Sequence, residues 1–306
     1  MASADSPKKM TYGLPIGQLR PQGLALILGL ASYGNKSWEE WVIGEEEGIE
    51  HIKAAYDAGI QTFIPQMFIP MASLNAFWER LSSNSTCLEM RLWHSLERLQ
   101  LDYVDVFQCH RFDYDTPIAE TMQALHDVVK AGYARYIGMS SCHAYQFHAM
   151  QNYAINNNLT PFISMQNQYN LIYREEEREM MPTLKMFGVG MIPWSPLSQG
   201  VLSRPYSQTS LRAETSVPGA WAKKTKEDNK EIIVRLENIA KARGISMAQV
   251  AIAWELSKSD IVAPIIGATK LERLKDTIGA IDVKLTDEEI QQLEEGYVAQ
   301  PIQGYI

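Results

Sequence analysis

A polar cluster of His110, Arg111 and Asp113 directly follows a short stretch of β-branched and aromatic residues, 103–108. This is the pattern of a buried parallel strand that emerges at its carboxyl end, and reactive groups of α/β proteins lie at such ends. Histidine can hydrogen-bond a substrate or transfer a proton near neutral pH, so His110 is a candidate catalytic residue. The alternative is a structural histidine that completes a hydrogen-bond network.

From about residue 86 onward, strand-like and helix-like segments alternate. The alternation predicts repeated βα units around a parallel sheet. Proline and capping residues mark helix starts at Thr116-Pro117, Ser246-x-x-Gln249 and Thr286-x-x-Glu289. The expected strands lie at 103–108, 136–141, 162–167, 190–197 and 263–268, and expected helices include 116–132, 143–157, 174–187 and 230–243.

Three parts of the chain depart from this rhythm. A polar stretch at 203–229 is expected to be a long loop, of the kind that can fold over a ligand. Before residue 64 the pattern predicts a strand and turn, a helix at 45–58 and the start of another strand, whereas 64–90 shows no assignable periodicity. No interior linker is visible, so residues 1–306 are expected to form a single domain.

Composition excludes several classes of protein. The chain has 306 residues, 46% of them hydrophobic, and a net charge of −8, which argues against nucleic acid as a partner because no basic stripe could neutralise phosphates. The same charge also serves solubility. Its three cysteines lack metal-ligand spacing and are odd in number, so we expect neither a metal site nor a disulfide framework. With no apolar segment long enough for a signal peptide or a membrane span, a cytoplasmic protein is expected.

Several motifs together resemble the aldo-keto reductases, and most closely their fungal aryl-alcohol-dehydrogenase-like branch. The motifs lie at 55–63, 95–99, 110–113, 140–141, 166–167, 194–197 and 267–273. The resemblance implies a (β/α)8 TIM barrel and an NADPH-dependent oxidoreductase that reduces a small-molecule aldehyde or ketone, including aromatic and secondary-metabolite carbonyls. From the charge and the lack of a long apolar run, we expect neither a nucleic-acid nor a membrane partner.

The resemblance also implies roles for single residues. His110 matches the histidine that hydrogen-bonds the substrate carbonyl, whereas Ser140, Ser141 and Gln166 match residues that fix the nicotinamide carboxamide. Trp194 matches an aromatic residue that stacks on the nicotinamide. Without the resemblance, core packing would explain Trp194 equally well.

At the last expected strand, Lys270 and Arg273 match a cationic pair for the adenosine 2′-phosphate, and Asp276 matches an acid near the adenine. A helix N-terminus and a guanidinium group both favour phosphate, although a solvated helix face would give the same two residues. Thr277 stands where many members have asparagine. The remaining expected cofactor residues are Ser195, Leu197, Gly267 and Thr269.

Three catalytic groups of the family have no counterpart. Ile64 stands at the position of the catalytic aspartate and Ile69 at that of the catalytic tyrosine, and no lysine occurs from Phe63 to His110. We therefore expect an incomplete barrel, with about one βα unit missing after the second strand.

A frameshift or a deletion near residues 64–90 would explain this departure. Permitted codons for 64–87, read one base out of step, can spell the family motif with its aspartate and tyrosine, and residues 14–26 behave likewise. The sequence thus leaves three readings: a reductase, a catalytically inactive NADPH-binding relative, or a non-functional product of a frameshifted gene.

Overall fold

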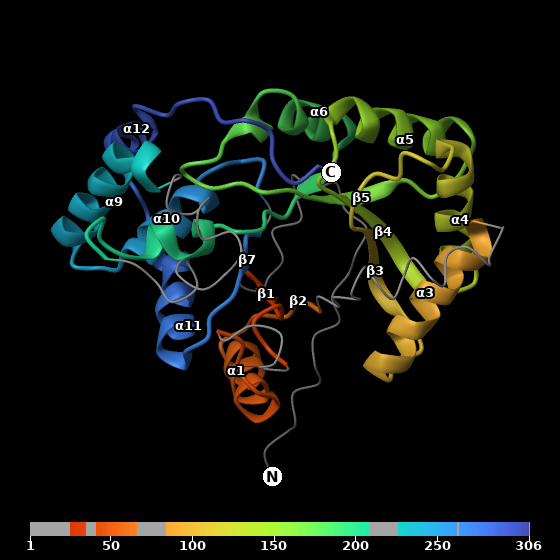
Figure 1. The fold of residues 1–306 in the computed structure, drawn as a ribbon, viewed down its shortest axis with the longest axis horizontal. Coiled ribbons are helices and arrows are strands. Elements are labelled where there is room, and N and C mark those ends of the chain that lie inside the picture. Colours follow the sequence, from red (N-terminus) through yellow and green to blue (C-terminus); the bar gives the residue numbers. More distant parts are fainter. Residues whose placement is uncertain (1–24, 35–40, 66–83, 209–225, 262, 306) are drawn as a thin grey trace, which may run out of the picture.

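The computed structural model describes residues 25–34, 41–65, 84–208, 226–261 and 263–305 (Figure 1). The strands are β1 (Ile27–Gly29), β2 (Phe63–Ile64), β3 (Val104–Cys109), β4 (Ala134–Ser140), β5 (Phe162–Gln166), β6 (Gly190–Met191) and β7 (Ile265–Ile266). The α-helices are α1 (Glu45–Asp57), α3 (Asn84–Leu99), α4 (Ile118–Lys130), α5 (Ala144–Asn156), α6 (Met180–Phe187), α9 (Lys230–Arg243), α10 (Met247–Leu256), α11 (Leu271–Ile278) and α12 (Asp287–Glu294). Short 3-10 helices are η1 (Glu175–Glu177), η2 (Ser198–Ser203) and η3 (Gly279–Asp282). No helix among these residues is both long and apolar enough to cross a membrane.

All paired strands run parallel, in sheets of order β2-β1-β7 and β3-β4-β5-β6. Two contacts join the sheets: the Ile265 N–H donates to the Pro193 carbonyl at 2.8 Å, and Met191 bridges Ile261 in parallel. The strands therefore form one curved row, β2-β1-β7-β6-β5-β4-β3, with helices outside it (Figure 1). This is the strand order of a (β/α)8 barrel.

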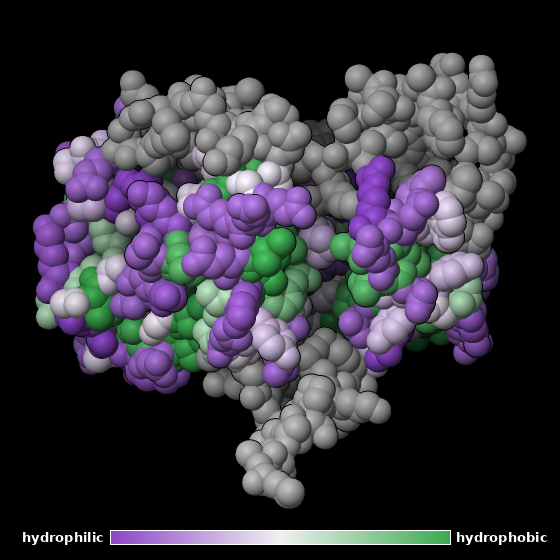
Figure 2. Space-filling model, turned by 90° about the horizontal axis from the view of Figure 1, so that it is seen from below, coloured by the Kyte–Doolittle hydropathy of each residue, from purple (hydrophilic) through white to green (hydrophobic). Residues whose placement is uncertain are grey.

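One step of that barrel order is unfilled in the described part of the chain. Among the described strands, the step from β6 to β7 is made only by these two contacts, no contact joins β2 to β3, and no closed barrel forms. Residues 66–83, where sequence reasoning expects the missing unit, lie outside the described ranges. In Figure 2, which views the molecule from below, hydrophobic residues (green) lie to the left and to the right of the centre of the picture.

Most expected helix boundaries are confirmed, whereas the strands expected at 190–197 and 263–268 are shorter, Gly190–Met191 and Ile265–Ile266. The Ser246 hydroxyl accepts the Gln249 N–H, and Thr286 and Glu289 form a reciprocal capping box. The helix expected at 174–187 is divided into η1 and α6 instead, because the ring of Pro182 cannot follow a regular α-helical turn. Helix α3 begins inside the segment that shows no assignable pattern.

The start of α4 also differs from expectation. Thr116 does not cap it: its hydroxyl donates to Asp113 Oδ2 at 2.8 Å, and Pro117 occupies the N-cap position. The Asp113 carboxylate also accepts the N–H groups of Asp115 and Thr116. The polar cluster after β3 is thus a closed turn that fixes the loop next to His110.

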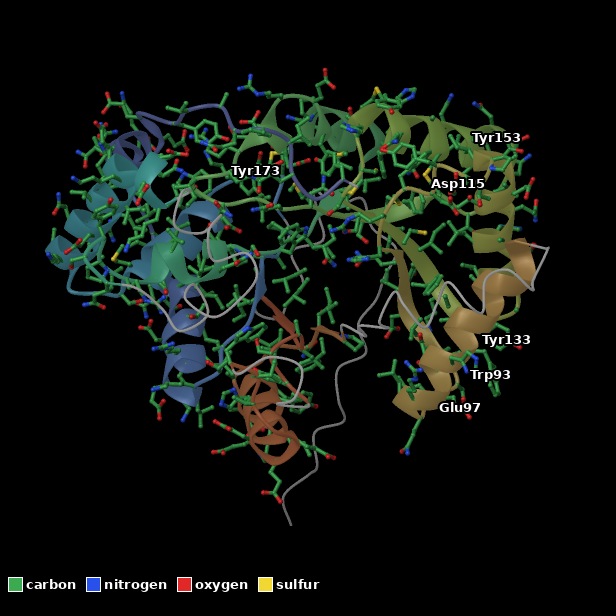
Figure 3. All side chains as sticks on the ribbon, in the orientation of Figure 1. Trp93, Glu97, Asp115, Tyr133, Tyr153 and Tyr173 are labelled. Carbon is green, nitrogen blue, oxygen red and sulfur yellow. The ribbon has the colours of Figure 1, made fainter. Side chains whose placement is uncertain are left out.

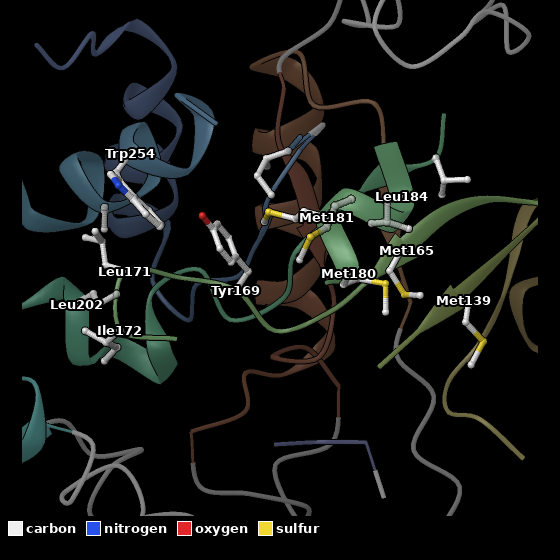
Figure 4. Packing of buried hydrophobic residues seen from close by; sticks show 14 of the residues in the cluster. Met139, Met165, Tyr169, Leu171, Ile172, Met180, Met181, Leu184, Leu202 and Trp254 are labelled. Carbon is white, nitrogen blue, oxygen red and sulfur yellow. The ribbon is translucent and has the colours of Figure 1, made fainter. Parts of the chain in front are cut away.

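The main core lies between β4–β6 and the helices outside them, and much of it is methionine (Figure 4). Met139, Met165 and Met191 come from three adjacent strands and are fully buried. At the other end of this core, the Tyr169 and Trp254 rings stack with centroids 5.4 Å apart. Flexible thioethers fill irregular space, whereas the stacked rings fix the distance between β5 and α10.

A carboxylate lies inside this packing without a partner. Glu255, on α10, has an exposed fraction of 0%, and neither of its oxygens has a hydrogen-bond partner within the described residues. Burial raises the pKa of Glu255 well above its ordinary value. The folded state therefore keeps a proton on this group at pH values where the unfolded chain releases it.

Glu255 should consequently make the protein less stable as pH rises. The unfolded carboxyl titrates near its ordinary pKa of about 4.3, so proton release above that pH favours unfolding until the higher folded pKa is reached. We expect chemical denaturation to show a loss of stability between pH 5 and pH 8 that Glu255→Gln reduces. Glu255→Leu should add about 1–3 kcal/mol at pH 8. A steeper loss of stability with pH in Glu255→Gln than in the parent would contradict this assignment.

Within the described residues one edge of β2 and one edge of β3 are unpaired, and such edges should limit stability. Unpaired strand edges and the apolar surfaces beside them favour association. We expect calorimetry to show unfolding at or below about 50 °C, with light scattering that grows with protein concentration. A reversible, concentration-independent transition well above that temperature would show that the edges are closed.

Candidate functional site

Three expected site residues are brought together by strand register. Cys109 of β3 pairs with Met139 of β4, and Ser140 of β4 pairs with Gln166 of β5. His110, one residue beyond Cys109, is therefore level with Ser140. The carboxyl ends of β3, β4 and β5 thus present an imidazole, a hydroxyl and an amide in one row.

A serine–tryptophan cluster, consisting of Ser140, Ser141, Gln166 and Trp194, occupies this edge. The Ser140 hydroxyl donates to the Gln166 carbonyl at 2.6 Å, and the Gln166 side-chain amide donates to Gln108 Oε1 at 2.6 Å. Trp194 Nε1 donates to Ser141 Oγ at 3.2 Å. Each side chain is held by a polar neighbour, which fixes the cluster's geometry before any ligand arrives.

The backbone at this edge is held in a costly conformation. Ser141 and Ser195 have φ angles of 43° and 56°, in the left-handed region that residues with a Cβ rarely occupy. Ser198 and Gln199, in η2, do the same. Such conformations cost about 1–3 kcal/mol each and gather at functional sites. They follow β4 and β6, the strands that carry the cluster.

The indole of Trp194 is held in place but only partly buried, as expected for a side chain that lines a binding site. Its residue is only partly buried, its backbone N–H donates to the Asn167 carbonyl at 2.9 Å, and Asn170 fixes the following carbonyl, that of Ser195. Pure core packing would leave the indole fully enclosed, as it does for Trp254. The partly open indole of Trp194 can instead stack on a planar ring.

His110 is exposed at the row's outer end. Partial desolvation of its ring, and then the positive charge of Arg111, lower the pKa of His110. Arg111 is held beside it, since its Nη1 donates to the His110 carbonyl at 2.6 Å. A neutral imidazole at pH 7 can hydrogen-bond a carbonyl oxygen without carrying a charge.

A cation cluster, consisting of Arg204, Lys226, Lys270 and Arg273, lies on the β7 side of the edge. Lys270 is the N-cap residue of α11, and Arg273 lies in its first turn. Burial and the charge of Arg273 lower the pKa of Arg204, and burial and the charge of Arg204 lower that of Lys226. No carboxylate pairs with these four residues in the described part of the chain. Like charges gathered without a counter-ion fit an anionic ligand such as phosphate.

Sequence reasoning missed Arg204 and Lys226. Both lie in the polar stretch 203–229, where no local pattern distinguishes a ligand contact from a solvated loop. Arg204 is positioned by the kink of η2: Gly200 has φ of 94°, and a Cβ there would lie 3.1 Å from Arg204 Nη1. Glycine at 200 thus leaves room for the guanidinium group.

The other expected cofactor residues follow β6 and β7. Ser195 and Leu197 precede η2, Gly267 and Thr269 lie between β7 and α11, and Asp276 is in the last turns of α11. The Thr277 hydroxyl donates to the Arg273 carbonyl at 2.8 Å, within its own helix. The hydroxyl of Thr277, the residue at the position where sequence reasoning expects an asparagine in many members of the family, is thus engaged within α11.

One of the two positions at which sequence reasoning expects the family's aspartate and tyrosine to be replaced lies in the described residues. Ile64 is the last residue of β2, so an aliphatic side chain stands where an aspartate is expected. Ile69 lies outside the described residues.

Comparison with known proteins agrees with this arrangement. The sequence model of the Aldo/keto reductase family matches residues 74–297. The chain is 40% identical to a protein named as an aryl-alcohol dehydrogenase from Schizosaccharomyces pombe, over 92% of this chain and 94% of the relative. It is 39% identical to versiconal hemiacetal acetate reductase from Aspergillus parasiticus, over 90% and 94% of the two chains.

Both alignments, of 333 and 326 positions, are longer than the 306 residues of this chain, so both relatives have positions without a counterpart in it. The matches nonetheless extend across most of the sequence and include the strand ends that form the site. The chain belongs to the aldo/keto reductase family.

Proposed function

We propose that this protein binds NADPH along the carboxyl edge of its sheet and acts as an oxidoreductase on aldehydes or ketones. The observation that carries the proposal is the division of this edge into two regions. The cation cluster suits the 2′-phosphate and the serine–tryptophan cluster suits the nicotinamide. NADH lacks the 2′-phosphate, so these cations, which pair with no carboxylate among the described residues, favour NADPH over NADH.

Bound NADPH would supply a hydride to a carbonyl carbon. Trp194 would cover one face of the nicotinamide, and Ser140, Ser141 and Gln166 would hold its carboxamide. His110 would hydrogen-bond the carbonyl oxygen and stabilise the negative charge that develops there. The names of the relatives support aromatic or secondary-metabolite carbonyls as substrates.

Proton supply limits this activity. With Ile64 and Ile69 at the positions of the family's aspartate and tyrosine, and no lysine between Phe63 and His110, the oxygen would take its proton from water. A positioned general acid contributes about 10²–10⁴-fold to rate, so turnover should be slow by that factor. The longer alignments with the relatives support a missing βα unit as the cause.

A second candidate function is NADPH binding without turnover. The observation that favours it is Ile64 in β2, which removes the charged partner of the family's proton relay while leaving the cofactor-binding edge intact. The two functions share the same binding site and differ only in whether a carbonyl is reduced.

Removing the cations should weaken NADPH binding selectively. We expect Arg204→Ala and Arg273→Ala each to raise the Kd for NADPH by about tenfold to a hundredfold, because each removes a charge-assisted contact to phosphate. Titration calorimetry should show a much smaller change for NADH. Arg135→Ala, which removes an exposed arginine at the amino end of β4, is the matched control. Equal losses for both dinucleotides would refute the assignment of the 2′-phosphate.

Loss of His110 should affect chemistry and leave cofactor binding intact. We expect His110→Ala to lower kcat/KM for NADPH oxidation with an aromatic aldehyde by about a hundredfold, with the Kd for NADPH unchanged. Absorbance at the reduced nicotinamide band measures both the slow parent rate and the variant. A parent protein that binds NADPH but oxidises none with any carbonyl would establish the second function instead.

A further inference from the structure

The serine–tryptophan cluster depends on a buried amide, that of Asn167. Asn167 has an exposed fraction of 0%, and its Oδ1 accepts the Ser141 backbone N–H at 2.7 Å. This bond is the shorter of two made by the Ser141 N–H, which also reaches the Gln166 carbonyl at 3.2 Å, and it helps to hold Ser141 in its left-handed conformation, from which the hydroxyl accepts the Trp194 indole N–H. If the Asn167 amide turned over, it would present N–H to N–H and leave Ser141 with only the longer bond to Gln166.

Two side chains fix the orientation of that amide. Asn167 Nδ2 donates to Glu176 Oε2 at 2.5 Å and to the Tyr305 hydroxyl at 3.2 Å. The Tyr305 hydroxyl in turn donates to Glu176 Oε1. Glu176, Tyr305 and Asn167 therefore form a closed triangle of hydrogen bonds.

Glu176 makes this triangle without help from a cation. Only 2% of the residue is exposed, and no ion pair reaches its carboxylate in the described ranges. Burial raises the pKa of Glu176 to about 7, although the bonds from Tyr305 and Asn167 oppose the rise. A carboxylate so enclosed is costly, and its two donors are what compensate for the lost water.

Tyr305 reaches the triangle from the far end of the chain. It ends the tail segment (residues 296–305), which crosses from α12 to β5 in Figure 1. Polar bonds secure this segment along its length. The Tyr297 hydroxyl donates to Glu175, the Gln300 N–H donates to the same carboxylate, and the Gln303 N–H donates to the Tyr173 hydroxyl, labelled in Figure 3.

The tail segment also contacts the cluster directly. A Cβ at Gly304 would lie 3.5 Å from Trp194 Cζ2 and 3.8 Å from Arg111 Nη2. The segment therefore packs against the edge of the indole ring and against the arginine beside His110. It forms a wall of the site at the nicotinamide end.

We propose that Glu176 and Tyr305 are positioning residues that lock the nicotinamide end of the cofactor site through Asn167, so that the tail segment is part of the binding site. This inference rests on the proposed binding of NADPH. It assigns the lock to one end of the cofactor only, because among the described residues the hydrogen bonds of Glu176, Tyr305 and Asn167 stay at the nicotinamide end and none reaches the cation cluster.

A fragment of the cofactor separates the two ends. Adenosine 2′,5′-bisphosphate carries the 2′-phosphate and lacks the nicotinamide. We expect Tyr305→Phe to raise the Kd for NADPH roughly tenfold while leaving the Kd for adenosine 2′,5′-bisphosphate unchanged, as measured by titration calorimetry. A role in general stability would weaken binding of both ligands.

Tyr297→Phe is the matched control, because it removes a hydroxyl bonded to the neighbouring Glu175 from the same tail segment, without touching Asn167. It should leave both affinities unchanged. Glu176→Gln tests the same lock if Tyr305→Phe does not fold: its amide must turn an N–H toward one of the two donors, and the same selective loss is expected.

The outcomes distinguish the lock from the proposed function. A parent protein that binds neither ligand would overturn both. The lock alone would be overturned if the parent binds both ligands and the two variants, Tyr305→Phe and Glu176→Gln, either leave both Kd values unchanged or raise both by the same factor.

Discussion

The hydrogen bond from Ile265 to the Pro193 carbonyl joins the two sheets, and the candidate site depends on this junction. On one side of it lie the strands that carry the serine–tryptophan cluster, and on the other lies the strand that leads into α11 and its cations. A dinucleotide can contact both regions only if their strand ends face the same edge. Parallel pairing through this junction guarantees that orientation, since all carboxyl ends then point one way.

β2 and β3, which no strand joins in the described part of the chain, lie at the two ends of the strand order, opposite that junction. Proton supply in the family therefore depends on the part of the barrel beside the step from β2 to β3, whereas the proposed cofactor site does not. The residues proposed to bind NADPH lie between β4 and α11, on both sides of the junction, whereas Ile64, at the position expected for the family's aspartate, ends β2 at the other end of the strand order. A single lost βα unit can remove the proton relay and expose two strand edges while the cofactor-binding edge keeps its pairing.

Local patterns predicted what depends on neighbours in sequence. The strand before His110, the caps at Ser246 and Thr286, and the end of α9 before Gly244 follow from rules that act within a few residues. Contacts made across the chain had no such signal. Three consecutive glutamates, Glu175–Glu177, are typical of a solvated helix face, yet Glu176 is buried against a tyrosine 129 residues away.

The cations show the same limit. Lys270 and Arg273 were identified because a known motif contains them, whereas Arg204 could be recognised only when the kink at Gly200 placed its guanidinium near theirs. A net charge of −8 gave no hint of a local positive site, since total charge says nothing about where charges gather.

Two buried glutamates show how environment separates a role from a liability. Glu176 and Glu255 are both almost fully enclosed, and burial raises the pKa of each. Glu176 accepts two hydrogen bonds, and those bonds determine how Asn167, and through it Ser141, is held. Glu255 accepts no hydrogen bond within the described residues, so it orients no neighbouring group there. Burying either carboxylate destabilises the fold. Of the two, only Glu176 offsets this cost, because its oxygens accept the hydrogen bonds that orient Asn167.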